Sequence, residues 1–326
     1  MKVCKTRSTA LLGAITLFAS SALGFSQEAK EEVLDSIRYF ERPDGHSELQ
    51  TAIVSFQHPE GAVVDLVGAV HIGDESYFRQ INQLLSTYDV VLYELVGGPM
   101  EDRGKAQRDE LGLTHLMQRV TQNILGLKYQ LEGIDYSQPN FVHADATWDQ
   151  WDSLMKSRDQ NMATLFRRAM ELEGDPAMKE KVEQMGSEEM MAELGKAITE
   201  FNPDKLKKNL APLLANSETF IDMIEGDDGT VLISERNKIV MKAIEEQVAM
   251  GQKKVAVFYG AGHMPDFEKR LTALGYTQGD TQWIQAWDIG DGTTPLNGLD
   301  IVENLLKDDY VVESVMGFLR GLVPQE

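Results

Sequence analysis

Two histidines end apolar segments that stand nearly 200 residues apart in the chain. Gly68-Ala69-Val70-His71 closes an apolar run that begins at Val64, and Gly260-Ala261-Gly262-His263 closes a run that begins at Val255. In α/β folds, ligands and chemistry gather at the carboxyl ends of strands. A glycine allows a positive φ and close backbone approach, so each motif is expected to turn the chain and present its histidine at the sheet edge. Two such motifs together predict one shared site.

An acidic residue is expected to join the two histidines. Glu94 lies in the apolar segment 90–96, which predicts a strand beside the one that ends at His71. A carboxylate there is costly unless it is paired. Glu94 is therefore expected to pair with Arg236 or another arginine, or to bind a divalent metal together with His71 and His263. Two imidazoles and one carboxylate would leave an open catalytic position on manganese, cobalt or zinc.

Glu94 is also a general-base candidate, and four more residues are candidates for the same site. Arg236 would pair with a carboxylate or stabilise an oxyanion. His143 and Asp145 are expected at a helix N-terminus that faces the cleft, unless Asp145 or Thr147 only caps the helix beginning near Trp148. Asp74 either caps the helix after His71 or orients its imidazole.

These motifs resemble those of a known family. The chain is similar to the TraB/PrgY/GumN group, which is related to the Tiki metalloproteases, in Gly68–His71, Glu94, Gly260–His263 and the segment Ser234–Asn237. The resemblance spans about residues 48–289. It implies an EreA/ChaN-like α/β fold and, from the Tiki relatives, metal-dependent peptide cleavage with manganese or cobalt. The leading hypothesis is thus an exported metallopeptidase acting on a peptide or protein.

Two other functions fit the same residues. A protein of this fold could bind a peptide or haem without catalysis. A metal-independent hydrolase resembling erythromycin esterase would instead use histidine and glutamate as general bases. The sequence leaves the substrate and the oligomeric state open.

The first 26 residues predict a secretory signal peptide. A basic start (Lys2, Lys5 and Arg7) precedes the apolar stretch 10–23, which ends in an Ala22-Leu23-Gly24 cleavage pattern. The alternative is a membrane anchor, but this stretch is shorter than the roughly 20 residues that a spanning helix needs. We expect export to the periplasm or beyond, with no stable membrane span after cleavage.

Composition narrows the possible partners. The single cysteine, Cys4, lies in the predicted leader, so the mature chain has no disulfide or thiolate. Acidic residues outnumber basic ones by 52 to 31. This excess argues against nucleic acid and anionic membrane surfaces, because both require clustered positive charge.

The elements that carry these residues predict an α/β fold. We expect a mixed, partly parallel central sheet in one domain, residues 27–326, with a large helical insertion over about 100–250. The strands are expected at 48–56, 62–70, 89–95, 254–259 and 282–289, and helices outside the insertion at 75–86, 265–274 and 299–322.

Overall fold

The computed structural model describes four long stretches of the chain, residues 35–99, 125–161, 202–216 and 228–292. It also describes residues 164, 196, 221, 225–226, 303, 306–307, 311–313 and 316. All belong to one compact unit, Leu34–Glu326. The predicted leader, nearly half of the predicted helical insertion and most of the predicted C-terminal helix lie outside the described residues.

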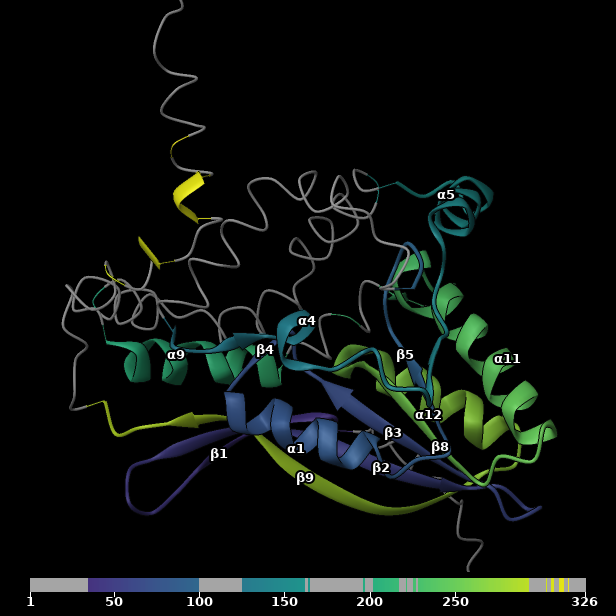
Figure 1. Cartoon of the computed structure of the whole chain (residues 1–326), viewed down its shortest axis with the longest axis horizontal. Coiled ribbons are helices and arrows are strands. Elements are labelled where there is room, and N and C mark those ends of the chain that lie inside the picture. Colours follow the sequence, from purple (N-terminus) through teal and green to yellow (C-terminus); the bar gives the residue numbers. More distant parts are fainter. Residues whose placement is uncertain are drawn as a thin grey trace, which may run out of the picture. The chain divides into compact units, whose positions relative to one another are not determined.

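A mixed seven-stranded sheet forms the centre (Figure 1). Four strands pair antiparallel around β2, and four pair in parallel on the other side of β3. This confirms a mixed, partly parallel α/β sheet. The order is β1 (Ile37–Glu41), β2 (Ser47–Gln57), β3 (Val63–Ala69), β8 (Lys254–Gly260), β5 (Val90–Tyr93) and β7 (Phe141–His143), with β9 (Thr277–Ile289) also paired to β2.

Strand β8 lies between β3 and β5. Val255 is in register with Val64 of β3 on one side and with Val90 of β5 on the other. The prediction that the strand before Glu94 directly neighbours the strand before His71 was therefore wrong. The physical reason is the composition of β8, whose residues 255–259 are all buried. A continuous apolar strand is most stable where both its faces and both its edges are covered.

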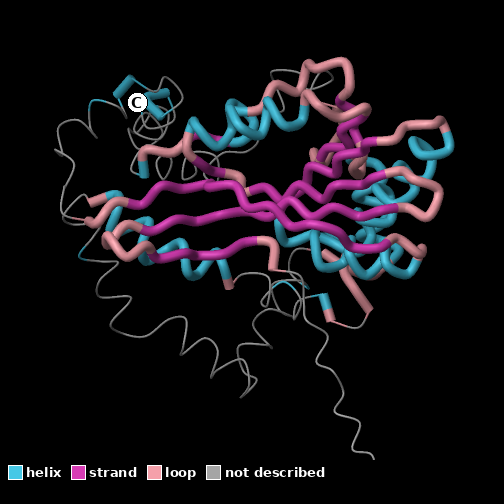
Figure 2. The backbone as a smooth tube through the Cα atoms, turned by 90° about the horizontal axis from the view of Figure 1, so that it is seen from below, coloured by secondary structure: helices cyan, strands magenta, loops and turns pink. Residues whose placement is uncertain are grey.

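Helices cover the two faces of the sheet (Figure 2). Helices α1 (Glu75–Leu85) and α9 (Pro203–Ala215) pack with Ala256 and Phe258 of β8 in one core. Helices α11 (Arg236–Ala249) and α12 (Met264–Ala273) pack with Val255 and Val257 in the other. Successive residues of β8 thus point into opposite cores, as a strand with a two-residue period requires.

The predicted helical insertion contains strands as well. Strand β6 (Lys128–Tyr129) pairs with β4 (Ile72–Gly73) in a second, two-stranded sheet. Helices α4 (Gln130–Gly133) and α5 (Trp148–Ser157) flank β7. His143 ends β7 rather than starting a helix, which corrects the prediction. A three-residue edge strand is too short to show a two-residue period in the sequence, and its pairing with β5 decides its structure.

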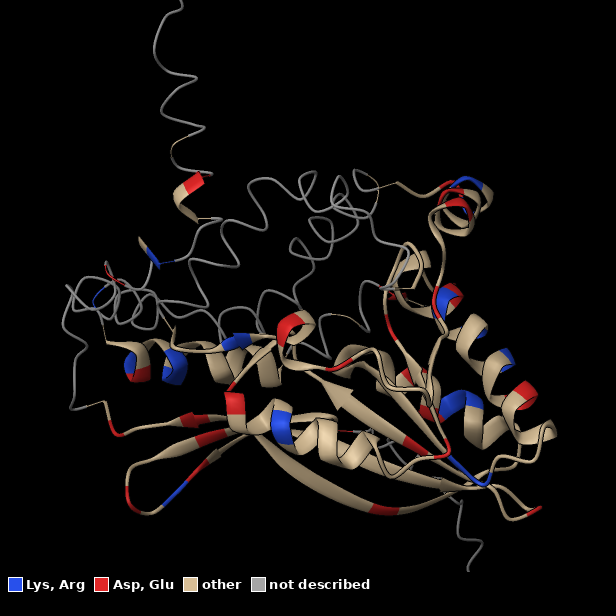
Figure 3. Ribbon diagram, in the orientation of Figure 1, with Lys and Arg blue, Asp and Glu red and all other residues tan. Residues whose placement is uncertain are grey.

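Charged residues lie mainly on the helices and at the strand ends (Figure 3). Lys and Arg are spread over α1, α5, α9 and α11 rather than gathered on one helix. Within the part of the chain that the structure describes, no helix combines the length and apolarity needed to cross a bilayer.

The central sheet makes a stability prediction. Leu66 of β3 is fully buried in the core beneath α11 and α12. Leu66→Ala should lower the free energy of unfolding by about 2–5 kcal/mol, because it removes apolar contacts and leaves a cavity. Leu274→Ala is the matched control, since Leu274 is 48% exposed, and it should change stability by less than about 0.5 kcal/mol. Urea unfolding measures both, and equal effects would contradict the assigned strand position.

Candidate functional site

Three adjacent parallel strands deliver the predicted site residues to one sheet edge. His71 follows the end of β3 by two residues, and Glu94 comes directly after β5. His263 ends the short helical turn Ala261–His263 that follows β8. Because the three strands run in parallel, their carboxyl ends meet at one edge. The structure therefore brings His71, Glu94 and His263 to the same edge.

A cavity of about 450 Å³ opens at this edge. Its size falls in the range of small-molecule sites, which combine apolar walls with a few polar groups. The polar residues of its lining are His71, Glu94, Glu225, Arg236 and His263, and the larger aliphatic ones are Ile37, Val70, Ile72, Leu214, Ile221, Leu232 and Ile233.

Arg236 hydrogen-bonds to Glu94 and His263 of the cavity lining and to the buried Asp145. Its Nε and Nη2 donate to the two carboxylate oxygens of Asp145 at 2.8 and 2.7 Å. Nη2 also donates to Glu94 Oε1 at 2.6 Å. Nη1 donates to the Leu232 carbonyl at 3.0 Å and to His263 Nε2 at 3.2 Å. These bonds use all five N–H donors of a guanidinium.

The five bonds define what Arg236 can do. Burial lowers its pKa, but the hydrogen bonds to Asp145 and the charges of Glu94 and Asp145 raise the pKa above its usual value. Arg236 thus remains a cation and pairs with Glu94, as one sequence alternative held. It could donate to an oxyanion only by giving up one of these bonds.

Asn237 determines which ring nitrogen of His263 carries the hydrogen. Its Nδ2 donates to Asp266 Oδ2 at 2.8 Å, and this partner can only accept when ionised. The Asn237 Oδ1 atom therefore faces His263 Nδ1, 2.6 Å away, and accepts a hydrogen bond from the Nδ1–H group. The lone pair of His263 is on Nε2, where it accepts from Arg236. Sequence reasoning missed this role, although a polar residue directly after Arg236 on the same helix was a signal.

Glu94 is held as a carboxylate. Its Oε2 accepts from the Gly260 N–H at 2.6 Å, and its Oε1 lies 3.6 Å from His263 Nε2. Burial raises the pKa of Glu94, but the charges of His263 and Arg236 outweigh burial and hold the pKa well below its usual 4.5.

The glycines of the two motifs provide space rather than an unusual backbone angle. Gly260 has a φ of −51°, and Gly68 is not among the glycines with positive φ. These glycines do not use the positive φ that glycine allows, but the expected close approach is present. A Cβ at Gly260 would lie 3.2 Å from Glu94 Oε2, and one at Gly68 would lie 3.2 Å from the Ala52 carbonyl oxygen.

A π-helical turn, η2 (Val231–Glu235), leads into Arg236. The Glu235 N–H donates to the Thr230 carbonyl at 3.1 Å, five residues back. The turn presents Leu232 and Ile233 to the cavity. Single π-helical turns are rare and frequently occur at functional sites.

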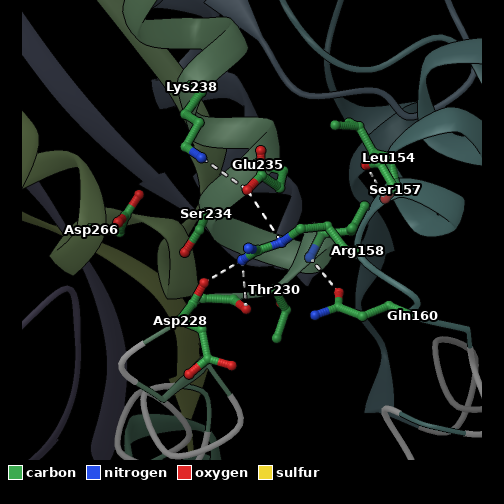
Figure 4. Close-up of polar contacts among 12 residues, drawn as sticks. Leu154, Ser157, Arg158, Gln160, Asp228, Thr230, Ser234, Glu235, Lys238 and Asp266 are labelled. Atoms are coloured by element: carbon green, nitrogen blue, oxygen red, sulfur yellow. Dashed lines mark hydrogen bonds and ion pairs between the residues drawn. The ribbon is translucent and has the colours of Figure 1, made fainter.

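Polar contacts hold this turn in place (Figure 4). Gln160 Oε1 accepts from the Val231 N–H at 2.9 Å, and Arg158 donates to the Gly229 carbonyl at 3.1 Å. The buried carboxylate of Glu225 accepts from the Thr230 N–H at 2.9 Å and from the Ser234 hydroxyl. Sequence reasoning missed Glu225, because its partners lie five to nine residues away and become donors only when the turn forms.

His71 is the exposed member of the site. Its carbonyl accepts from the Gln130 N–H at 2.8 Å, and the next residues pair with β6. These bonds fix the backbone of the loop while the imidazole lines the cavity.

The remaining candidates contact other parts of the fold. Asp74 begins α1 without a side-chain cap, accepts from the Asp288 N–H and lies 3.5 Å from Lys207 Nζ. Burial raises its pKa. His143 Nε2 lies 2.7 Å from the Leu95 carbonyl oxygen. Thr147 caps α5. Because Thr147 is the cap, neither Asp145 nor His143 begins the helix. Asp145 instead hydrogen-bonds to Arg236.

The turn after β8 carries backbone donors. Ala261 and Gly262 are its first residues, and both line the cavity. The first N–H groups of a helical turn have no partner within it. The β3–β8 ladder ends at the pair of Ala69 and Gly260, so the Gly262 N–H lies past it and can donate to a carbonyl or anionic oxygen of a ligand.

No model of a known protein family, no characterised protein and no solved structure matches the chain. The resemblance to the TraB group stays a prediction. Within the described ranges, no group of three or more His, Cys, Asp or Glu side chains is arranged to hold a metal ion.

The lowered pKa of Glu94 makes a pH prediction. A carboxylate whose folded pKa is depressed stabilises the fold above its unfolded pKa, and this contribution is lost as the pH falls toward the folded value. Glu94→Gln should therefore cost about 1.5–3 kcal/mol at pH 7, the worth of a hydrogen bond to a charged group. The difference from wild type should shrink steadily below about pH 4.5.

Urea unfolding between pH 3 and 7 measures this difference. Glu246→Gln is the control, because Glu246 forms an exposed pair with Lys242 at 3.6 Å. Its effect should stay within about 0.5 kcal/mol throughout. A Glu94→Gln effect that is equal at pH 3 and pH 7 would contradict the assigned protonation.

Proposed function

We propose that the protein is a hydrolase that cleaves a carbonyl-containing substrate, a peptide in the first instance, in the cavity at the carboxyl ends of β3, β8 and β5. The observation that carries the proposal is the Arg236-centred cluster of Glu94, Asp145 and His263 at an apolar cavity whose rim bears His71. A fixed charge network, an accessible imidazole and a backbone N–H group at one cavity are the parts that acyl-transfer sites share.

Each group takes a role that its surroundings allow. His71 accepts the proton of the attacking water and returns it to the leaving group, because imidazole suits proton transfer near neutral pH. The Gly262 N–H receives the developing oxyanion. Glu94 is a weak base with its lowered pKa, and it stabilises positive charge that forms on the nearby imidazoles. Arg236 positions Glu94 and His263.

The metal-dependent form of this hypothesis is part of the proposal. Imidazole and carboxylate are donor types that manganese, cobalt and zinc accept. His71 and Glu94 have lone pairs to offer, whereas His263 Nε2 would first have to leave Arg236. When bound there, such an ion would supply Lewis-acid polarisation of the carbonyl. The residues named above position the substrate and move its protons.

Further parts of the proposal rest on the sequence. Membership of the EreA/ChaN-like superfamily is supported by the two Gly-x-x-His motifs and the strand-end glutamate, and export is supported by the N-terminal leader pattern. The apolar cavity also supports the alternative that the protein binds a peptide or haem without cleaving it.

Substitution of His71 tests catalysis. We expect His71→Ala to lower kcat/KM on p-nitrophenyl butyrate and on a fluorogenic peptide library by about 10²–10⁴-fold, the usual loss for a general base. His46→Ala is the matched control, because His46 lies in the turn between β1 and β2 away from the cavity, and it should leave the rate unchanged. Binding of substrate without turnover by wild type would favour the non-catalytic alternative.

Metal removal tests the cofactor. Dialysis against EDTA should abolish turnover, and manganese, cobalt or zinc should restore it, if the ion supplies the electrophile. Calorimetric titration of each ion should also give binding that Glu94→Gln weakens at least tenfold. Turnover that survives EDTA would reject the metal-dependent form and leave the imidazole mechanism standing.

A further inference from the structure

One aliphatic side chain lies directly against the turn that carries the backbone donors. A Cβ atom built on Gly262 would lie 2.4 Å from Cδ1 of Ile221, far inside any real contact. Gly262 is not among the glycines with positive φ, so its backbone does not require glycine. The absence of a side chain at residue 262 instead leaves the space that the Ile221 side chain occupies. Both residues line the cavity.

We propose that the Gly262–Ile221 contact sets the width of the cavity beside the reacting carbonyl and selects substrates with a small, uncharged apolar acyl group. This inference rests on the proposed function, because it places the carbonyl oxygen at the Gly262 N–H. The group attached to that carbonyl then reaches the Ile221 side chain.

The charges of the lining disfavour an acidic group. Arg236 uses all five donors on Asp145, Glu94, Leu232 and His263. It is the one Lys or Arg among the lining residues that the structure describes. An acidic acyl group would therefore meet the Glu94 carboxylate without a free cation to pair with it.

Paired size changes at the two positions test the proposal. The measurement is the ratio of kcat/KM for p-nitrophenyl hexanoate to that for p-nitrophenyl acetate. Gly262→Ala adds one methyl group and should lower the ratio about fourfold, the effect of one buried CH₂ group. Ile221→Val should raise it about fourfold and Ile221→Ala at least tenfold. In the double variant, Ile221→Ala should restore the ratio lost through Gly262→Ala.

Ile239→Ala is the matched control. Ile239 lies on α11 and does not line this cavity, so the same deletion there should leave the ratio unchanged. Ratios that do not differ between wild type and both Ile221 variants would overturn the inference. The milder Ile221→Val variant keeps the test usable if Ile221→Ala fails to fold.

A binding measurement separates this inference from the proposed function. Calorimetric titration with 1-butanol and 1-hexanol needs no catalysis. Ile221→Ala should strengthen 1-hexanol binding relative to 1-butanol, and Gly262→Ala should weaken it. This pattern without ester or peptide turnover would support the cavity assignment and reject the hydrolase. Ester or peptide turnover combined with unchanged alkanol selectivity would support the hydrolase and reject the cavity assignment.

Discussion

The buried guanidinium of Arg236 is the constraint on which the rest of the site depends. A cation out of water costs several kcal/mol unless its partners are complete. Here the partners come from four places, namely the end of β5, the loop after β7, the π-helical turn and the turn after β8. None of these segments can satisfy Arg236 alone. Their close approach is therefore a condition of folding, and Glu94 and His263 are fixed in position as a result.

The sheet order makes that approach possible. With β8 between β3 and β5, three strand ends lie side by side, and the central one leads into a helical turn. The glycine at the start of that turn leaves room for Glu94 Oε2 and donates its N–H to it. Asn237 and Asp266 continue the network on the outer side of His263. The charge of Glu94, the tautomer of His263 and the backbone at Gly260 are thus all consistent with the same arrangement of the site.

The sequence predicts those parts of the fold that depend on local pattern. Apolar runs such as 255–259 identify buried strands, and the repeated Gly-x-x-His motif identifies the sheet edge. Strand order is not local, so nothing near Glu94 indicates that β8 is its neighbour. β7 is too short to show a period. The bonds of Glu225 and Asn237 depend on partners in the π-helical turn and α12, so the sequence offers only the polar type of Asn237 beside Arg236 as a signal.

The position of β8 also determines when the site can exist. Its two neighbours, residues 63–69 and 90–93, leave the ribosome long before residues 254–260 do. Until then the two earlier strands have open edges towards the place that β8 will occupy. Parallel pairing over such a sequence distance forms slowly and leaves edges exposed to aggregation. The nascent chain therefore lacks a complete cavity for most of its synthesis, and a chaperone has a defined period in which to bind it.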